Sequence, residues 1–144
     1  MLDKVKSRRL WAVVWTLIAM VVGLVLRYGP YHFPHFLAKY GGSAVWTGMI
    51  YTLFVIAFPH RRPLDICIMA SALSIIIEYI KLFNTPSFYA FRFTMAGQLI
   101  FGRHFAYSDI IAYLVGALAF FAIDAYMQSR PGRGRIVQTQ PEAL

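Results

Sequence analysis

The sequence predicts an all-α membrane protein: four transmembrane helices in a bundle, with a short interfacial helix between the third and the fourth. Of the 144 residues, 59% are hydrophobic and only 14% are charged, whereas charged residues make up about a quarter of a typical soluble domain. The hydrophobic residues concentrate in four segments, each close to the roughly 20 residues that a helix needs to cross a hydrocarbon core about 30 Å thick. No linker rich in Pro, Gly and Ser separates these segments, so we interpret residues 1–129 as a single membrane domain.

The first two predicted spans, residues 10–26 and 41–58, contain no charged residue. A basic stretch followed by an apolar run is also typical of a secretory signal peptide, but no small-residue cleavage site follows the first run, and three more apolar segments do. We therefore interpret it as the first membrane helix. The connection formed by residues 27–40 is rich in proline and aromatic residues, which favours a position at the level of the lipid headgroups.

The third and fourth predicted spans, residues 64–83 and 107–127, carry charged residues near their ends. These are Asp65, Glu78 and Lys81 in the third span and Asp109 and Asp124 in the fourth. Either Ser108 or Asp109 is expected to cap the start of the fourth helix, where an acidic side chain also suits the positive end of the helix dipole.

The connection between these two spans, about residues 84–106, is predicted to contain a short helix. Thr85 followed by Pro86 favours a helix start, because a threonine side chain can accept hydrogen bonds from free amides and a proline in the first position has no amide to satisfy. Apolar side chains then recur at intervals of three and four, which predicts a face that dips into the membrane or packs on the bundle. They are Phe88, Phe91 and Met95, and Gly97 and Gly102 are expected to let the chain turn back.

The basic residues predict the orientation in the membrane. Nine of them fall on one side of the predicted bundle: Lys4, Lys6, Arg8, Arg9, Arg61, Arg62, Arg130, Arg133 and Arg135. Four fall on the other side: Arg27, Lys39, Arg92 and Arg103. Because the side richer in Lys and Arg faces the cytoplasm, both termini should be cytoplasmic. The net charge of +8 then reflects topology and contact with anionic lipids rather than nucleic-acid binding, and residues 130–144 are expected to form a disordered tail.

Ionisable residues also gather at the outer side of the predicted bundle. Glu78 lies five residues before Phe83, about 7–8 Å along the helix and so just below the outer surface. A carboxylate at this depth needs a partner, and Lys81 lies one turn away on the same face. The candidate ligand-binding residues are Arg27, Lys39, Glu78, Lys81, Arg92, Arg103 and Asp109.

Two interpretations of this cluster compete. In a structural interpretation, Glu78 and Lys81 neutralise each other and the arginines extend to the headgroups. In a functional interpretation, the forked side chains of Arg92 and Arg103 bind phosphate or carboxylate. The functional interpretation predicts a protein that binds an anionic lipid, or a lipid-linked precursor of the cell envelope, and performs no chemistry on it. The alternative is an accessory or structural subunit whose charges meet a membrane protein partner.

Catalysis and metal binding have less support in the sequence. Glu78 and Asp109 would suit the acid and base of a hydrolase or transferase acting on a lipid-linked sugar, which is a third hypothesis, but no nucleophile motif accompanies them. His32 and His35 have a spacing compatible with metal, yet a proline stands between them and no third ligand is evident. Cys67 is the only cysteine, so the chain has neither an internal disulfide nor a cysteine cluster. We expect no metal and no cofactor.

The run from Glu78 onward, EYIKLFNTPSFYAFRFTMAGQLIFGRHFAYSDIIAYLVGA, resembles a small bacterial membrane family described as domain of unknown function 2809, which is itself similar to VanZ-like proteins. The stretch FPHFLAKYGGSAVW, residues 33–46, resembles the first outer connection of that family, and together the two cover most of residues 27–117. The residues to which the resemblance points are Arg27, Lys39, Glu78, Arg92, Gly97, Gly102 and Asp109.

The chain departs from the family pattern at two positions within this region. Lys81 stands where glutamine is usual, and Ser43 stands where aspartate is usual. Both differences move charge within the candidate site and alter its expected ligand preference. The resemblance implies a multi-pass protein of the bacterial inner membrane. Because the VanZ-like group is associated with resistance to glycopeptide antibiotics of the teicoplanin type, it also implies a relation to the cell envelope.

Overall fold

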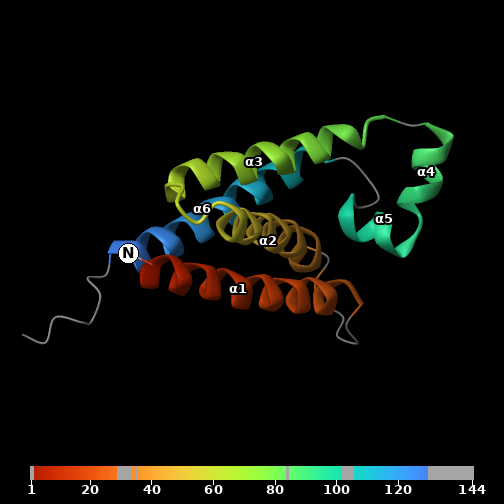
Figure 1. The fold of residues 1–144 in the computed structure, drawn as a ribbon. Helices are drawn as coiled ribbons and strands as arrows, with labels where there is room; N and C mark the ends of the chain where they lie inside the picture. Colours follow the sequence, from red (N-terminus) through yellow and green to blue (C-terminus); the bar gives the residue numbers. More distant parts are fainter. Residues whose placement is uncertain (1, 29–33, 35, 84, 102–105, 130–144) are drawn as a thin grey trace, which may run out of the picture.

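The structure is a computed structural model that describes residues 2–28, 34, 36–83, 85–101 and 106–129. Its elements, all of them helical within these ranges, appear in Figure 1 in the following order. They are α1 (Leu2–Tyr28), the π-helical turn η1 (Leu37–Gly41), α2 (Gly42–Ala57), α3 (Pro63–Ile80), α4 (Pro86–Arg92), α5 (Met95–Ile100) and α6 (Tyr107–Ser129). The tail that we expected over residues 130–144 lies outside the described residues.

Four segments are long and apolar enough to cross a membrane, which confirms the predicted all-α membrane fold. They are Lys4–Leu26, Leu37–Ala57, Pro63–Ile80 and Tyr107–Ser129. The first helix begins earlier than the predicted span, because the charged residues before residue 10 continue the helix beyond its apolar part. The third ends at Ile80 rather than at residue 83, because the chain turns immediately after it.

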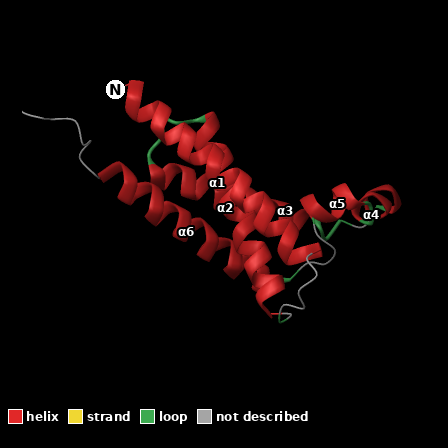
Figure 2. Ribbon diagram, turned by 90° about the horizontal axis from the view of Figure 1, so that it is seen from below, coloured by secondary structure: helices red, strands yellow, loops and turns green. Residues whose placement is uncertain are grey.

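The four long helices run side by side, and α2 occupies the centre of the bundle, where it packs against α1, α3 and α6 (Figures 1 and 2). The buried core is apolar and consists of Ala12, Ile50, Tyr51, Val55, Ile66, Cys67, Ala70 and Ala117. Small residues let the helices approach closely, as in other membrane bundles. A Cβ atom on Gly116 of α6 would lie 2.3 Å from the carbonyl oxygen of Ala44 in α2.

Large apolar side chains cover the outside of the bundle. On α1 they include Leu10, Leu17 and Val21, each more than half exposed. In water such a surface would drive aggregation, whereas hydrocarbon solvates it well. Charged residues such as Glu78 and Asp124 instead lie inside, as expected for a protein whose solvent is lipid.

The connection between α3 and α6 contains two short helices rather than the single helix that we expected. α4 begins directly after Thr85, as predicted, although no side-chain hydrogen bond caps it. It ends at Arg92, and α5 begins after Thr94, whose Oγ1 accepts a hydrogen bond from the amide of Gly97 at 3.1 Å. Because the chain bends between the two helices, Met95 does not continue the apolar face of α4.

We call α4 and α5 together the arm. The two helices pack on each other through rings, with Phe101 lying 5.2 Å from Phe88 and 6.3 Å from Phe91, centroid to centroid. We had expected Gly97 to lie at a turn, but it lies inside α5. A Cβ atom there would lie 2.0 Å from the carbonyl oxygen of Phe91, so the missing side chain allows α5 to approach the end of α4. Gly102 lies outside the described residues.

The start of α6 also differs from the prediction. The helix begins at Tyr107, so Ser108 and Asp109 lie within its first turn and neither caps it. Glu78 of α3 takes over this role, since its Oε1 accepts a hydrogen bond from the amide of Ala106 at 3.0 Å. A carboxylate in this position also lies at the positive end of the α6 dipole.

Candidate functional site

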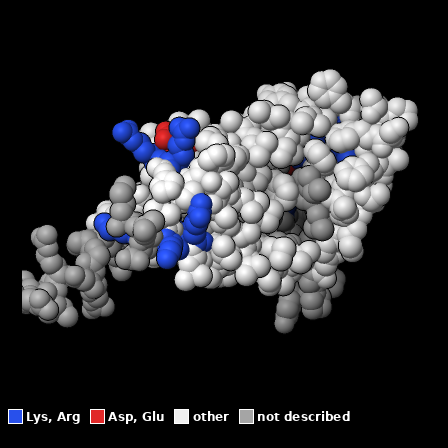
Figure 3. Space-filling view, in the orientation of Figure 1, with Lys and Arg blue, Asp and Glu red and all other residues white. Residues whose placement is uncertain are grey.

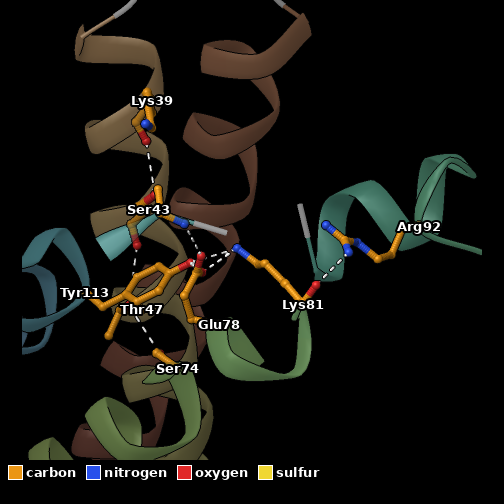
Figure 4. A network of polar contacts seen from close by, with 9 residues as sticks. Lys39, Ser43, Thr47, Ser74, Glu78, Lys81, Arg92 and Tyr113 are labelled. Atoms are coloured by element: carbon orange, nitrogen blue, oxygen red, sulfur yellow. Dashed lines mark hydrogen bonds and ion pairs between the residues drawn. The ribbon is translucent and has the colours of Figure 1, made fainter. Parts of the chain in front are cut away.

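Glu78 is the centre of a buried polar network at the α4–α5 end of the bundle (Figure 4). Its Oε2 accepts a hydrogen bond from the hydroxyl of Tyr113 at 2.6 Å and forms an ion pair with Nζ of Lys81. Its Oε1 accepts from the amide of Ala106. The carboxylate of Glu78 therefore joins three parts of the chain. They are α3, which carries it, Lys81 just after the end of α3, and the beginning of α6 with the residue that precedes it.

Lys81 and Arg92 connect this carboxylate to the arm. Glu78 is 0% exposed, Lys81 6% and Arg92 5%. Nη1 of Arg92 donates a hydrogen bond to the carbonyl oxygen of Lys81 at 3.0 Å, and the guanidinium lies 5.8 Å from the centre of the Phe88 ring. Figure 4 shows Lys81 between Glu78 on one side and Arg92 on the other. Arg92 thus holds the arm to the end of α3, next to the buried ion pair of Glu78 and Lys81.

A ladder of hydroxyl groups continues from the network along α2. Ser43 Oγ donates to the carbonyl oxygen of Lys39 at 3.1 Å. Thr47 Oγ1, which has a single hydrogen, lies within hydrogen-bond distance of both the carbonyl oxygen of Ser43, at 3.4 Å, and Ser74 Oγ, at 3.2 Å. Lys39 joins this ladder through its backbone only. Its ammonium lies 5.3 Å from the centre of the Tyr40 ring.

Asp109 completes the acidic part of the site. It lies in the first turn of α6 and is 7% exposed. Since it precedes Tyr113 by four residues, both side chains are on the same face of α6. The amide of Asp109 donates to the carbonyl oxygen of Ala106 at 3.0 Å. Asp109 is therefore one helical turn from Ala106, whose own amide binds Glu78.

The structure brings together most of the predicted site residues that it describes. Glu78 and Lys81 are paired, Arg92 contacts the backbone of Lys81, and Asp109 lies one turn from Tyr113. The side chain of Arg27, and Arg103 as a whole, lie outside the described part of the structure.

Sequence analysis missed Tyr113 and the hydroxyl ladder of Ser43, Thr47 and Ser74. Tyr113 follows Asp109 at a helical spacing of four, which is the signal that indicates a shared face.

A second polar cluster at the opposite end of the bundle was also missed. Arg8 of α1 binds both carboxylate oxygens of Asp124 in α6, from Nε at 3.0 Å and from Nη2 at 2.6 Å. Asp124 also accepts from the hydroxyl of Tyr51 at 2.8 Å. Nη1 of Arg8 donates to the carbonyl oxygens of Pro59 and Arg61. This cluster holds α1, α2, α6 and the α2–α3 turn together. The guanidinium of Arg8 and the carboxylate of Asp124 both have hydrogen-bond partners within it.

The space-filling view separates the two ends (Figure 3). Lys and Arg side chains stand out from the surface at the end that holds the N-terminus, opposite the arm. At the arm end, only small areas of basic and acidic atoms are visible, in a hollow between the arm and the bundle. The ionisable groups near the arm are therefore enclosed, whereas the other end has exposed basic side chains, such as Arg61 and Arg62, in addition to the buried pair of Arg8 and Asp124.

The family model described as "Protein of unknown function (DUF2809)" matches residues 32–117, a range that includes the π-helical turn, α2, α3, the arm and the first half of α6. No solved structure matches the chain.

Proposed function

Because the chain belongs to the family of proteins of unknown function DUF2809, which assigns no activity, we propose a function from the site itself. The protein binds the anionic headgroup of a lipid, or of a lipid-linked precursor of the cell envelope, in the polar cluster at the arm end of the bundle. It performs no chemistry on this ligand.

The observation that carries the proposal is a buried set of ionisable side chains in a bundle whose outer surface is apolar. Glu78, Lys81, Arg92 and Asp109 are each less than 10% exposed. Ionisable groups are expensive at membrane depth, and those that occur there usually belong to a functional site. An ion pair that only held helices together would not need two further charged side chains beside it.

The balance of charge favours an anionic ligand. Glu78 is already matched by Lys81, Tyr113 and the amide of Ala106. Lys81 and Arg92 lie beside the two acids Glu78 and Asp109, and Lys39 is near enough to interact electrostatically with Asp109, so with Lys39 included positive charge is in excess. Arginine suits such a role because its planar fork forms two parallel hydrogen bonds to phosphate or carboxylate.

The arm supports entry of the ligand from the side. Its exposed residues are largely aromatic or apolar: Tyr89, Phe91, Phe93 and Met95 are each more than 40% exposed. Aromatic side chains favour the interface between lipid and water. A lipid whose tails remain in the bilayer can therefore place its headgroup in the hollow beside the arm (Figure 3).

We also propose the orientation and cellular location that the sequence predicts. Arg8 contacts the backbone of Pro59 and Arg61, so the basic start of α1 and the basic α2–α3 turn share one end of the bundle. If that end is cytoplasmic, the site faces the outer side of a bacterial inner membrane. The similarity to VanZ-like proteins and the relation to the cell envelope are part of the same proposal.

One observation favours a second candidate function, an accessory subunit of a membrane complex. The exposed rings of the arm, among them Tyr89 and Phe93, would serve equally well as a contact surface for a protein partner, since aromatic residues are enriched in such interfaces. In this case the charged cluster only fixes the position of the arm.

Native mass spectrometry of the protein in lipid nanodiscs tests both candidates. The wild-type protein is compared with the double variant Arg92→Ala, Arg103→Ala, and co-purifying lipids and proteins are identified by mass. We expect a retained anionic lipid that the double variant loses by tenfold or more, because a hydrogen bond to a charged group contributes about 1.5–3 kcal/mol. A stoichiometric protein without specific lipid would instead support the accessory subunit.

Two controls make the comparison specific. The variant Arg61→Ala, Arg62→Ala removes two exposed basic residues at the opposite end and should retain the lipid. The variant Arg92→Lys, Arg103→Lys keeps the charge and loses the fork, so it should bind weakly but measurably. Equal lipid retention by the wild type and by Arg92→Ala, Arg103→Ala would refute the proposed function.

A further inference from the structure

Asp109 carries a buried acceptor that the described residues do not use. Its Oδ1 is buried, and none of the residues that the structure describes donates a hydrogen bond to it. The side chain as a whole is 93% buried, as its exposed fraction of 7% shows. Buried carboxylate oxygens nearly always have a donor, so an exception calls for an explanation, such as a ligand or a water molecule.

The position of Asp109 connects this acceptor to the basic cluster. The residue lies one turn before Tyr113, which binds Glu78, and it interacts electrostatically with Glu78, Lys39 and Lys81. Neither ammonium makes a hydrogen bond to Asp109 within the described part of the chain. The unused oxygen therefore belongs to the same polar cluster as these side chains, without being neutralised by direct contact.

We propose that Oδ1 of Asp109 accepts a hydrogen bond from the bound ligand, which therefore carries an N–H or O–H donor a few bonds from its phosphate. This inference rests on the proposed function, in which the basic residues bind the phosphate. A carboxylate and a basic cluster side by side are complementary to a headgroup that has an anionic part and a donating part. The acid also excludes ligands that offer only negative charge, because these leave Asp109 without a donor.

Common headgroups divide clearly by this criterion. Phosphoethanolamine and phosphoglycerol each have a phosphate with an ammonium or hydroxyl donor nearby, and a lipid-linked sugar diphosphate has the hydroxyls of its sugar. Phosphocholine has the same phosphate and the same net charge as phosphoethanolamine, but its nitrogen is fully methylated and donates nothing. The comparison of phosphoethanolamine with phosphocholine thus isolates the donor.

The test uses the full-length protein in nanodiscs that contain phosphatidylethanolamine, phosphatidylglycerol and phosphatidylcholine in equal amounts with identical acyl chains. Native mass spectrometry measures which lipid is retained. We expect the two donor-bearing lipids to exceed phosphatidylcholine about tenfold. A parallel sample, extracted directly from cell membranes, shows by mass whether a glycerophospholipid or a lipid-linked sugar is the native source of this chemistry.

Two variants assign the preference to the acceptor. Asp109→Leu removes it, and phosphatidylethanolamine and phosphatidylcholine, which have the same net charge, should then be retained equally. Asp109→Asn has nearly the same shape and keeps an acceptor oxygen without the charge, so it should prefer phosphatidylethanolamine over phosphatidylcholine more weakly than the wild type does. Thermal unfolding of each variant in the same nanodiscs separates loss of binding from loss of fold, and the weaker preference expected of Asp109→Asn provides the test should Asp109→Leu not fold.

The two proposals fail in different ways. If wild-type protein retains all three lipids equally while the Arg92→Ala, Arg103→Ala variant loses them, the phosphate site stands and the role of Asp109 is refuted. An unchanged preference for phosphatidylethanolamine over phosphatidylcholine in Asp109→Leu leads to the same result, and water then satisfies the carboxylate. If the arginine variant retains lipid as the wild type does, the proposed function itself is wrong.

Discussion

Replacement of Lys81 by methionine removes the cation from a carboxylate that has no contact with solvent. Glu78 is fully buried, and the substitution leaves it with two neutral donors, the hydroxyl of Tyr113 and the amide of Ala106. Removal of one partner from a buried ion pair destabilises a protein by about 3–5 kcal/mol, because the remaining charge stays buried without compensation. We expect Lys81→Met to lower the free energy of unfolding by this amount.

The double variant Glu78→Gln, Lys81→Met separates the cost of an unpaired charge from the value of the pair. Glutamine has nearly the shape of glutamate and can still accept hydrogen bonds from Tyr113 and Ala106. Because no charge remains buried, the double variant should be more stable than Lys81→Met alone by about 1–3 kcal/mol, the range of coupling energies between residues in contact. The control Lys39→Met removes an ammonium that rests on the Tyr40 ring, and it should cost no more than about 1 kcal/mol.

Unfolding can be measured in mixed micelles by titration with a denaturing detergent, with the fluorescence of the three tryptophans as the signal. The cycle requires wild type, Glu78→Gln, Lys81→Met and the double variant under identical conditions. Wild-type stability in Lys81→Met, or a double variant that is no more stable than Lys81→Met, would refute the view that the two charges form one buried unit.

Further predictions concern contacts in other parts of the bundle. Tyr113→Phe deletes a hydrogen bond to a charged group and should destabilise by about 1.5–3 kcal/mol in the same titration, whereas Tyr89→Phe on the exposed arm should be neutral; equal effects would contradict the assigned contact. Gly116→Ala should destabilise by about 1–3 kcal/mol, because its methyl group meets α2 backbone. Gly42→Ala adds a methyl group in open space and should be neutral or stabilising. If Gly42→Ala destabilised the protein more than Gly116→Ala, the close contact between α6 and α2 at Gly116 would be refuted. Asp124→Asn leaves the buried guanidinium of Arg8 without its anion and should lower the free energy of unfolding by about 3 kcal/mol or more. An unchanged unfolding midpoint would argue against the ion pair of Arg8 and Asp124.

Local sequence determined what lies within a few residues along one helix. The approach of Lys81 to Glu78 follows from their spacing of three, and the start of α4 follows from the threonine and proline that precede it. The second cap was equally local but escaped notice: Thr94 precedes α5 just as Thr85 precedes α4. A single helix was predicted because the apolar spacing from Phe88 to Met95 is uninterrupted, whereas backbone capping decides where a helix stops.

Contacts between distant helices were not predictable in the same way. Glu78 and Tyr113 are 35 residues apart, and Arg8 and Asp124 are 116 apart. Each pair depends on which faces of the helices meet and at what relative height. In a soluble bundle, alternation of polar and apolar residues reports the buried face, but a membrane helix is apolar toward lipid and toward its neighbours alike.

Composition alone thus determined that this chain is a membrane protein with four spans, because the cost of placing polar backbone or charge in hydrocarbon leaves few other solutions. The position of charged residues near the span ends also followed from sequence. Only the tertiary structure decided that Glu78 caps α6, that Arg92 fastens the arm, and that Asp109 keeps a buried oxygen without a donor among the described residues. These features depend on the register between helices, which small residues and close packing set and which no apolar pattern records.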